Sequence, residues 1–197
     1  KIKPINLERM FERYAAGVYR NSAVEAAPQS AVERPVPPSS FVLPESGYAT
    51  PDPERPIRWI PGEDLQTGDR VHLPLEFVQY PPPESRHKPA ITTGLGLSTD
   101  GVGALLSGLY EVVERDATML SWYSTFEPIE LVVDSERFET LARRARSEGL
   151  SVTPQLHTQD VDVPVVSVAV HRAGEWPQFA LGAAADLRAT TAAEDAL

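Results

Sequence analysis

A chain of 197 residues with 42% hydrophobic residues is long enough to bury one substantial core. Its 28 acidic and 18 basic residues give a net charge of −10, which argues against nucleic acid or an anionic membrane as a partner. The absence of cysteine excludes disulfides, thiolate catalysis and cysteine-ligated zinc. No stretch has the continuous apolar character of a signal peptide or a membrane span, so we expect a cytoplasmic protein.

The first predicted element is an amphipathic helix from Asn6 to Arg20. Its apolar residues recur at the spacing of one helical stripe, while Glu8 and Glu12 fall one turn apart on another face. Between residues 28 and 89 the chain holds most of its 19 prolines, which exclude a helix over most of this span. Within it, "IRWIPGEDLQTGDRVHLPLEFV" has aromatic and β-branched residues on both sides of a Thr-Gly-Asp turn. We therefore expect an irregular arm that contains a small hairpin.

More regular patterns follow. "AITTGLGLSTDG" predicts a short strand and a glycine turn, after which a helix capped by Asp100 runs from Gly101 to about Trp122. Further elements are expected in chain order: a strand at Ile129–Val133, a helix ended by Gly149, and strands at Ser151–Leu156, Val163–His171 and Gln178–Ala184. The spacing of Thr191 and Glu194 is that of a capping box, which predicts the start of a last helix.

This order of elements predicts an α/β (α+β) sandwich of a mixed sheet and helices, with one long central helix. We expect a single domain over residues 1–197. Its parts are a first glutamate-bearing helical region (1–27), the proline-rich arm (28–89) and the α/β core (90–197). The four histidines, His72, His87, His157 and His171, lack the spacing of metal ligands and are expected at the surface or at strand ends.

The predicted central helix carries Glu111, Glu114 and Arg115 along one continuous edge. Leucine, valine and alanine occupy the rest of its circumference, so we expect it to be mostly buried. A buried carboxylate must be paired, hydrogen-bonded or bound to a metal, and two carboxylates one turn apart suit Mg²⁺. Taken alone, the motif favours an internal salt bridge, because ordinary helical charge pairing explains it.

The whole stretch "ITTGLGLSTDGVGALLSGLYEVVERDATMLSWY" closely resembles the central motif of the YcaO superfamily, a glycine turn followed by a helix with Glu-x-x-Glu-Arg-Asp. "FERYAAG" resembles the earlier helix of that family, and "PIRWIPGEDLQTGDRVHLPLEFV" resembles its connector. "DVDVPVVSVAV" and "FALGAAADLRATTAAEDAL" resemble its later strands and next helix. Because these motifs follow one another in order, the resemblance is more specific than any one of them.

The resemblance implies a YcaO-type fold and an enzyme of peptide modification that uses ATP and Mg²⁺. In such enzymes the oxygen of a peptide-backbone amide is phosphorylated, a nucleophile adds to the amide carbon, and phosphate leaves. A side-chain nucleophile gives an azoline (thiazole or oxazole), external sulfide gives a thioamide, and an amine gives an amidine. The resemblance also implies a precursor peptide as substrate, a peptide-binding partner protein, and a homodimer.

Carried over by position, the resemblance assigns metal binding to Glu12, Glu111 and Glu114, with Glu8 as a substitute because Arg9 occupies the place of the family's first glutamate. It assigns nucleotide contacts to Thr93, Gly94, Ser107 and Arg115, and it assigns no catalytic residue.

Several departures support a second hypothesis. Besides Arg9, the sequence has Ser98 at a family glycine and Ser107 where a larger polar residue is common. The family's N-terminal nucleotide segment and its C-terminal contacts have no counterpart in residues 1–197. The chain therefore resembles a core fragment, and the alternative to an enzyme is a non-catalytic YcaO-like scaffold or partner subunit, or a truncated inactive fragment.

Overall fold

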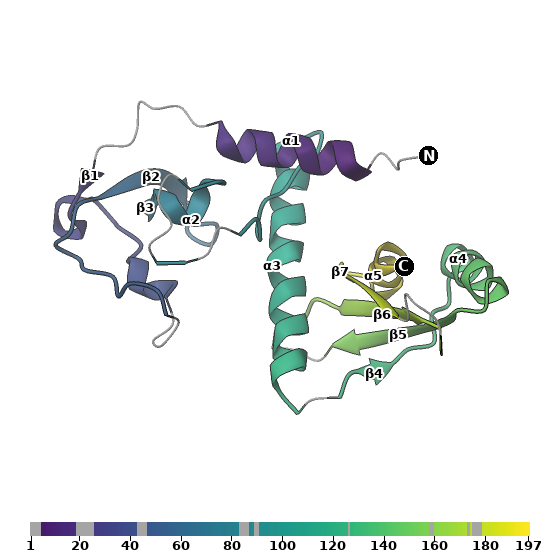
Figure 1. Cartoon of the computed structure of the whole chain (residues 1–197). Helices are drawn as coiled ribbons and strands as arrows, with labels where there is room; N and C mark the ends of the chain where they lie inside the picture. Colours follow the sequence, from purple (N-terminus) through teal and green to yellow (C-terminus); the bar gives the residue numbers. More distant parts are fainter. Residues whose placement is uncertain are drawn as a thin grey trace. The chain divides into compact units, whose positions relative to one another are not determined.

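The computed structural model describes residues 5–18, 26–42, 47–82, 87–88, 91–125, 127–157, 160–172, 174 and 179–197. The chain divides into two compact units, Lys1–Thr92 and Thr93–Leu197. Each unit is described by itself, and Figure 1 labels the elements of both. No helix among the described residues combines the length and apolar character needed to cross a bilayer.

The first unit contains a helix and a small antiparallel sheet. The helix α1 spans Ile5–Gly17, and the strands are β1 (Ala26–Ala27), β2 (Ile57–Glu63) and β3 (Arg70–Pro74), in the order β1-β2-β3. Short helical turns complete the unit: η2 (Gln29–Ala31), η3 (Pro38–Ser40) and α2 (Leu75–Val78). The helix predicted at 6–20 thus ends at Gly17, and positions 19 and 20 lie outside the described residues.

Strands β2 and β3 form the hairpin that the sequence predicts, with Glu63 opposite Arg70 at its end. Asp64 shapes the turn, because its Oδ1 accepts hydrogen bonds from the backbone N–H groups of Gln66 and Thr67 at 2.9 and 3.0 Å. The buried Trp59 ties the hairpin to β1, since its indole N–H donates to the Ala27 carbonyl at 2.9 Å. The proline-rich sequence therefore forms an ordered hairpin here.

The second unit is a four-stranded sheet with helices on both faces. Its strands are β4 (Ile129–Glu130), β5 (Ser151–His157), β6 (Val165–His171) and β7 (Phe179–Ala185), in the order β4-β5-β6-β7. Its helices are α3 (Gly101–Tyr123), α4 (Glu136–Ser147) and α5 (Ala189–Ala196), drawn in teal to yellow in Figure 1. The predicted α+β class is confirmed.

The pairing within this sheet differs from the sequence prediction of a mixed sheet. All neighbouring pairs among β4 to β7 are antiparallel. For β5–β6 and β6–β7 the reason is that short connections join the strands, whereas parallel neighbours need a crossover of a dozen or more residues. The pair β4–β5 is antiparallel although the connection between its strands contains α4.

Side chains alternate between the two faces of β6. Val166 and Val168 lie on one face and belong to the core shared with α4 and α5. Ser167 lies on the other face, where its hydroxyl contacts His157. His157 in turn contacts Ser121 of α3. The core of this unit therefore lies between the sheet and the α4–α5 layer, and α3 covers the other face.

Local signals at the helix ends give mixed results. Ser135 caps α4 by accepting the Phe138 N–H at 3.2 Å, and Gly149, with φ of 78°, follows the helix end as predicted. The prediction that Thr191 and Glu194 form a capping box at the start of the last helix is wrong, because α5 already begins at Ala189. The carboxylate of Glu194 instead accepts from the Ser135 hydroxyl and, at 3.2 Å, from Arg137. It therefore links α5 to the start of α4.

Two strand predictions also need correction. Residues 91–100 contain a turn and a bend but no strand, and residue 90 lies outside the described residues. The strand expected over Ile129–Val133 is limited to Ile129–Glu130.

Candidate functional site

The helix α3 begins at the cap that the sequence predicts. The Asp100 Oδ1 atom accepts the Gly103 N–H at 2.8 Å, and the helix continues for 23 residues to Tyr123. This helix carries Glu111, Glu114 and Arg115, so its position determines where these side chains lie.

The glycine turn before α3 packs directly on the helix backbone. A Cβ atom on Gly96 would lie 1.9 Å from the carbonyl oxygen of Ala104, and one on Gly108 would lie 2.5 Å from the carbonyl oxygen of Gly94. Gly94 itself has φ of 88°, which favours glycine. The turn and the helix can approach this closely only because these positions lack side chains. Sequence reasoning missed Gly108, although a glycine inside a helix is a usable signal of close packing.

Glu111 joins the turn to the helix. Its Oε2 accepts the Gly94 N–H at 3.0 Å, and its Oε1 accepts from the Arg115 guanidinium at 3.4 Å. The Glu111 side chain is 25% exposed, against 56% for Arg115. A carboxylate has about four acceptor sites, so these two bonds leave capacity for a further ligand. The structure therefore contains the salt bridge expected from the motif and also fixes the carboxylate against the glycine turn.

The remaining predicted residues of the second unit lie on α3 or in the turn. Glu114, one turn beyond Glu111, is half-buried, and its carbonyl accepts the Thr118 hydroxyl at 2.7 Å. Thr93 is half-buried in the turn, and Ser107 is exposed on the helix. The structure thus places Thr93, Gly94, Ser107, Glu111, Glu114 and Arg115 within this turn–helix segment.

Glu8 and Glu12 belong to α1 in the first unit, where Glu12 is half-buried and the Glu8 side chain lies outside the described part. Their joint metal site with Glu111 and Glu114 stays a prediction. Among the residues that the structure describes, no group of three or more His, Cys, Asp or Glu side chains is arranged to hold a metal ion.

The predicted burial of α3 is wrong. Gly108 and Ala117 are its buried residues, and the larger apolar residues between Val102 and Trp122 that face outward are 42 to 75% exposed. An apolar residue pattern predicts burial only where a partner surface covers each side of the helix. In this chain the glycine turn and the sheet cover narrow stripes of α3.

Two histidines are buried, His87 and His157. The expected position at the surface or at a strand end is wrong for His87 and holds for His157. His87 pairs through its Nδ1 with a Glu76 carboxylate oxygen. His157 ends β5, as expected, but it is only 9% exposed and contacts two serine hydroxyls. Burial lowers the pKa of His157 below its usual value. Sequence spacing gave no signal of either contact, because the partners come from other elements.

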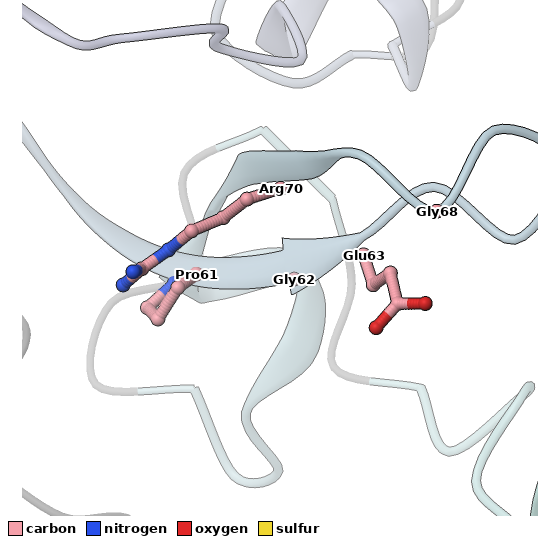
Figure 2. Close-up of a pocket in the computed structure, with 5 residues that line it drawn as sticks. All are labelled: Pro61, Gly62, Glu63, Gly68 and Arg70. Atoms are coloured by element: carbon pink, nitrogen blue, oxygen red, sulfur yellow. The ribbon is translucent and has the colours of Figure 1, made fainter.

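A shallow hollow of about 400 Å³ lies on the β2–β3 hairpin of the first unit (Figure 2). It is lined by Pro61, Gly62, Glu63, Gly68 and Arg70. In Figure 2 the Arg70 guanidinium ends near Pro61, whereas the Glu63 carboxylate turns away. None of the residues predicted to bind metal or nucleotide lines this hollow.

Comparison with known proteins gives a family match over nearly the whole chain. The family model described as "YcaO cyclodehydratase, ATP-ad Mg2+-binding" matches residues 8–197. A comparison with curated protein sequences gives no match.

Solved structures are also similar. The structure of YcaO from Methanopyrus kandleri bound with AMPPCP and Mg²⁺ is 28% identical with a TM-score of 0.74, covering 94% of this chain and 47% of that one. The heterocyclase TruD is 22% identical with a TM-score of 0.79, covering 98% of this chain and 32% of that one. A heterocyclase in complex with substrate and cofactor is 21% identical with a TM-score of 0.83, covering 96% of this chain and 29% of that one. This chain therefore spans less than half the length of each of these structures.

Proposed function

The chain belongs to the YcaO family, and on that premise we propose that it takes part in the ATP- and Mg²⁺-dependent activation of a peptide-backbone amide. In the proposed reaction the amide oxygen takes the γ-phosphoryl group of ATP as ADP leaves. A nucleophile then loses its proton and forms a bond to the amide carbon, and the carbon–oxygen bond breaks as phosphate leaves. The AMPPCP and Mg²⁺ bound to the related Methanopyrus kandleri YcaO support ATP and Mg²⁺ as ligands.

The observation that carries this proposal is the hydrogen bond between Glu111 and the Gly94 N–H, which joins the glycine turn to the carboxylate-bearing helix. Glu111 and Glu114 supply carboxylate oxygens, the ligands that Mg²⁺ prefers, and both are partly shielded from water. The exposed Arg115 guanidinium beside them suits a phosphate group. The residues present therefore fit a magnesium–nucleotide complex.

We assign metal binding to Glu111 and Glu114, with Glu12 and Glu8 of α1 as further ligands. Thr93, Gly94, Ser107 and Arg115 are assigned to the nucleotide. A bound Mg²⁺ would neutralise phosphate charge and polarise the phosphoryl oxygens. The chain's own contribution is to hold the carboxylates at the glycine turn and to offer the Arg115 cation to phosphate.

The finer parts of the proposal concern substrate and assembly. We propose a precursor peptide as substrate, presented by a peptide-binding partner protein, and a homodimeric assembly. A heterocyclase of similar fold has been solved in complex with substrate and cofactor. The unbroken family match over residues 8–197 supports one YcaO-like domain. The product, an azoline, a thioamide or an amidine, is decided by the nucleophile and can be read from the mass of the modified peptide.

The first test is calorimetric titration of the chain with Mg·ATP. The wild-type chain should bind saturably, and Glu114→Gln should weaken binding at least about tenfold, because one charged metal ligand is replaced by a neutral amide. Glu139→Gln is the matched control, since Glu139 lies on α4 and pairs with Arg146. Its affinity should equal that of the wild type.

Equal affinity of Glu114→Gln and the wild type would contradict the assigned ligand. A wild-type chain that does not bind Mg·ATP would favour the second candidate, a non-catalytic YcaO-like scaffold. The observation that favours this candidate is the Glu111–Arg115 ion pair, which explains the carboxylate without a metal.

A further inference from the structure

We propose that a chain of hydrogen bonds through the buried His157, Ser121–His157–Ser167, fixes α3 on the sheet and thereby positions the carboxylates of the nucleotide site. The three residues belong to α3, β5 and β6. The inference rests on the proposed function, and it makes Ser121 and His157 positioning residues that need not touch a ligand.

The contacts of His157 are short and use both ring nitrogens. Its Nδ1 lies 2.8 Å from the Ser121 Oγ, and its Nε2 lies 2.8 Å from the Ser167 Oγ. His157 is 9% exposed and Ser167 is 1% exposed. A neutral imidazole has one donor and one acceptor nitrogen, so one serine accepts from the ring and the other donates to it. The hydrogen bonds of His157 therefore join α3 to β5 and β6, and both ring nitrogens have a partner.

The helix α3 packs against β5, β6 and β7 of the sheet, and small residues make up its buried part. Its buried residues are Gly108 and Ala117, which offer small side chains for interlocking. Its larger apolar residues are substantially exposed. Apolar contact of this kind has weak directional preference, whereas a buried polar contact is satisfied in one geometry and selects one register. The hydrogen bond between Ser121 and His157 is thus the contact best suited to specify where α3 lies.

The helix connects this contact to the proposed site. Ser121 follows Glu114 by seven residues, which places both on one stripe with the buried Ala117 between them. At 1.5 Å per residue, Ser121 lies only about 10 Å from Glu114 along the axis. Metal ligation tolerates errors of only about 0.2 Å in ligand distance. Opening or rotation of α3 after loss of Ser121 would therefore disturb the carboxylates that precede it.

The charge state of His157 gives the proposal a pH signature. The groups that face the ring are the hydroxyls of Ser121 from α3 and Ser167 from β6, with Val165 as the residue paired to His157 in the sheet. Burial is the cause that lowers the pKa of His157, and no charged group contributes to it. The ring is therefore neutral at neutral pH. Its protonation would bury a positive charge and make both ring nitrogens donors, so the serine that had donated would have to turn its hydroxyl and accept.

The test compares three serine variants with the wild-type chain. Ser121→Ala removes the link to α3, and Ser121→Thr restores the hydroxyl. Ser147→Ala is the matched control, because the Ser147 hydroxyl donates to the Arg144 carbonyl within α4, 2.8 Å away. Each variant is examined by amide hydrogen exchange without nucleotide and by titration with Mg·ATP.

In Ser121→Ala, amides of residues 111–121 should exchange about fivefold faster, the size of effect expected for one buried hydrogen bond. The affinity for Mg·ATP at neutral pH should fall by about the same factor. The difference from the wild type should shrink only as the pH falls through the folded-state pKa of His157, which burial holds below the usual value of about 6.5. Ser121→Thr should recover most of both losses, and Ser147→Ala should show neither.

Unchanged exchange in α3 of Ser121→Ala would overturn the anchoring role. Faster exchange with unchanged affinity for Mg·ATP would overturn the positioning role. If the wild-type chain does not bind Mg·ATP, the proposed function fails, and the positioning role fails with it. The exchange data then still decide whether the hydrogen bonds anchor α3.

Discussion

Glu111 makes two contacts, an ion pair with Arg115 and a hydrogen bond with the glycine turn. Its ion pair with Arg115 is partly exposed, and such pairs contribute little to stability. The hydrogen bond from the Gly94 N–H is the more specific contact, because it holds a backbone turn at one point of the helix. The salt-bridge and ligand interpretations are therefore compatible, since the carboxylate keeps free acceptor positions.

At the same scale, the buried His157 predicts how stability depends on pH. Burial lowers the pKa of His157 in the folded state, while histidine in the unfolded chain keeps a pKa of about 6.5. The unfolded state therefore binds the proton more readily. The contribution of His157 to the free energy of unfolding is fully present above about pH 6.5. It is lost as the pH falls through the lower, folded-state pKa of His157. Urea unfolding at about pH 7.5 and pH 5.5 should give a lower free energy of unfolding at the acidic pH.

The variant His157→Gln tests whether His157, and no other titratable group, causes this pH dependence of stability. The variant should be less stable than the wild type at neutral pH, and its stability should change less between the two pH values. Asp64 and Asp69 do not confuse the comparison, because hydrogen bonds lower their pKa values and they titrate at more acidic pH. An identical pH dependence in His157→Gln and the wild type would show that another group is responsible.

At the scale of elements, the accuracy of sequence prediction follows the range of the interactions. The start of α3 at Asp100 and the end of α4 before Gly149 depend on residues within one turn, and both were predictable. The role of Glu194 was not, because its partner Ser135 is 59 residues away. The burial of α3 failed for the same reason, since it depends on which surfaces cover the helix.

The candidate site follows the same rule. The turn–helix segment with Gly94, Glu111 and Glu114 is continuous in sequence, so its motif could be found there. The chain through Ser121, His157 and Ser167 joins three separate elements and leaves no spacing pattern. Gly108 is an intermediate case, because a helical glycine indicates close packing without identifying the partner.

The contact between the glycine turn and α3 gives a prediction for this pair of elements. In Gly108→Ala, the new Cβ would meet the Gly94 carbonyl oxygen at 2.5 Å and its carbon at 3.3 Å, so the turn must move. Overpacking of this kind costs roughly 1–3 kcal/mol, against a gain of up to about 1 kcal/mol in helix propensity. We expect lower thermal stability and weaker Mg·ATP binding, measured by circular dichroism and titration.

Gly101→Ala is the control for helix propensity. An added Cβ on Gly101 meets no atom within 4 Å, so the same chemical change is made without a clash. Its stability should be equal to or above that of the wild type. Equal stability of the two variants would mean that the turn yields easily and that the close contact is unimportant.

At the scale of the whole molecule, each of the two compact units contains part of the family motif. The family match over residues 8–197 includes α1 as well as α3. The resemblance assigns Glu12 of α1 to the same metal as Glu111 and Glu114. A ligand that binds only the folded chain should therefore stabilise it by an amount that depends on residues from both units.

This dependence can be measured by thermal unfolding with and without Mg·ATP. At about 100 times its dissociation constant, a ligand stabilises the folded state by about 2.7 kcal/mol. Glu12→Gln should lose much of this stabilisation, because it removes one charged oxygen donor, and each variant is compared with its own unfolding without ligand. Glu63→Gln, in the hairpin of the same unit, should keep the full effect. If Glu12→Gln also keeps the full stabilisation, the metal ligands belong to the second unit alone. The helix α1, in which Arg9 occupies the position of the family's first glutamate, then takes no part in metal binding.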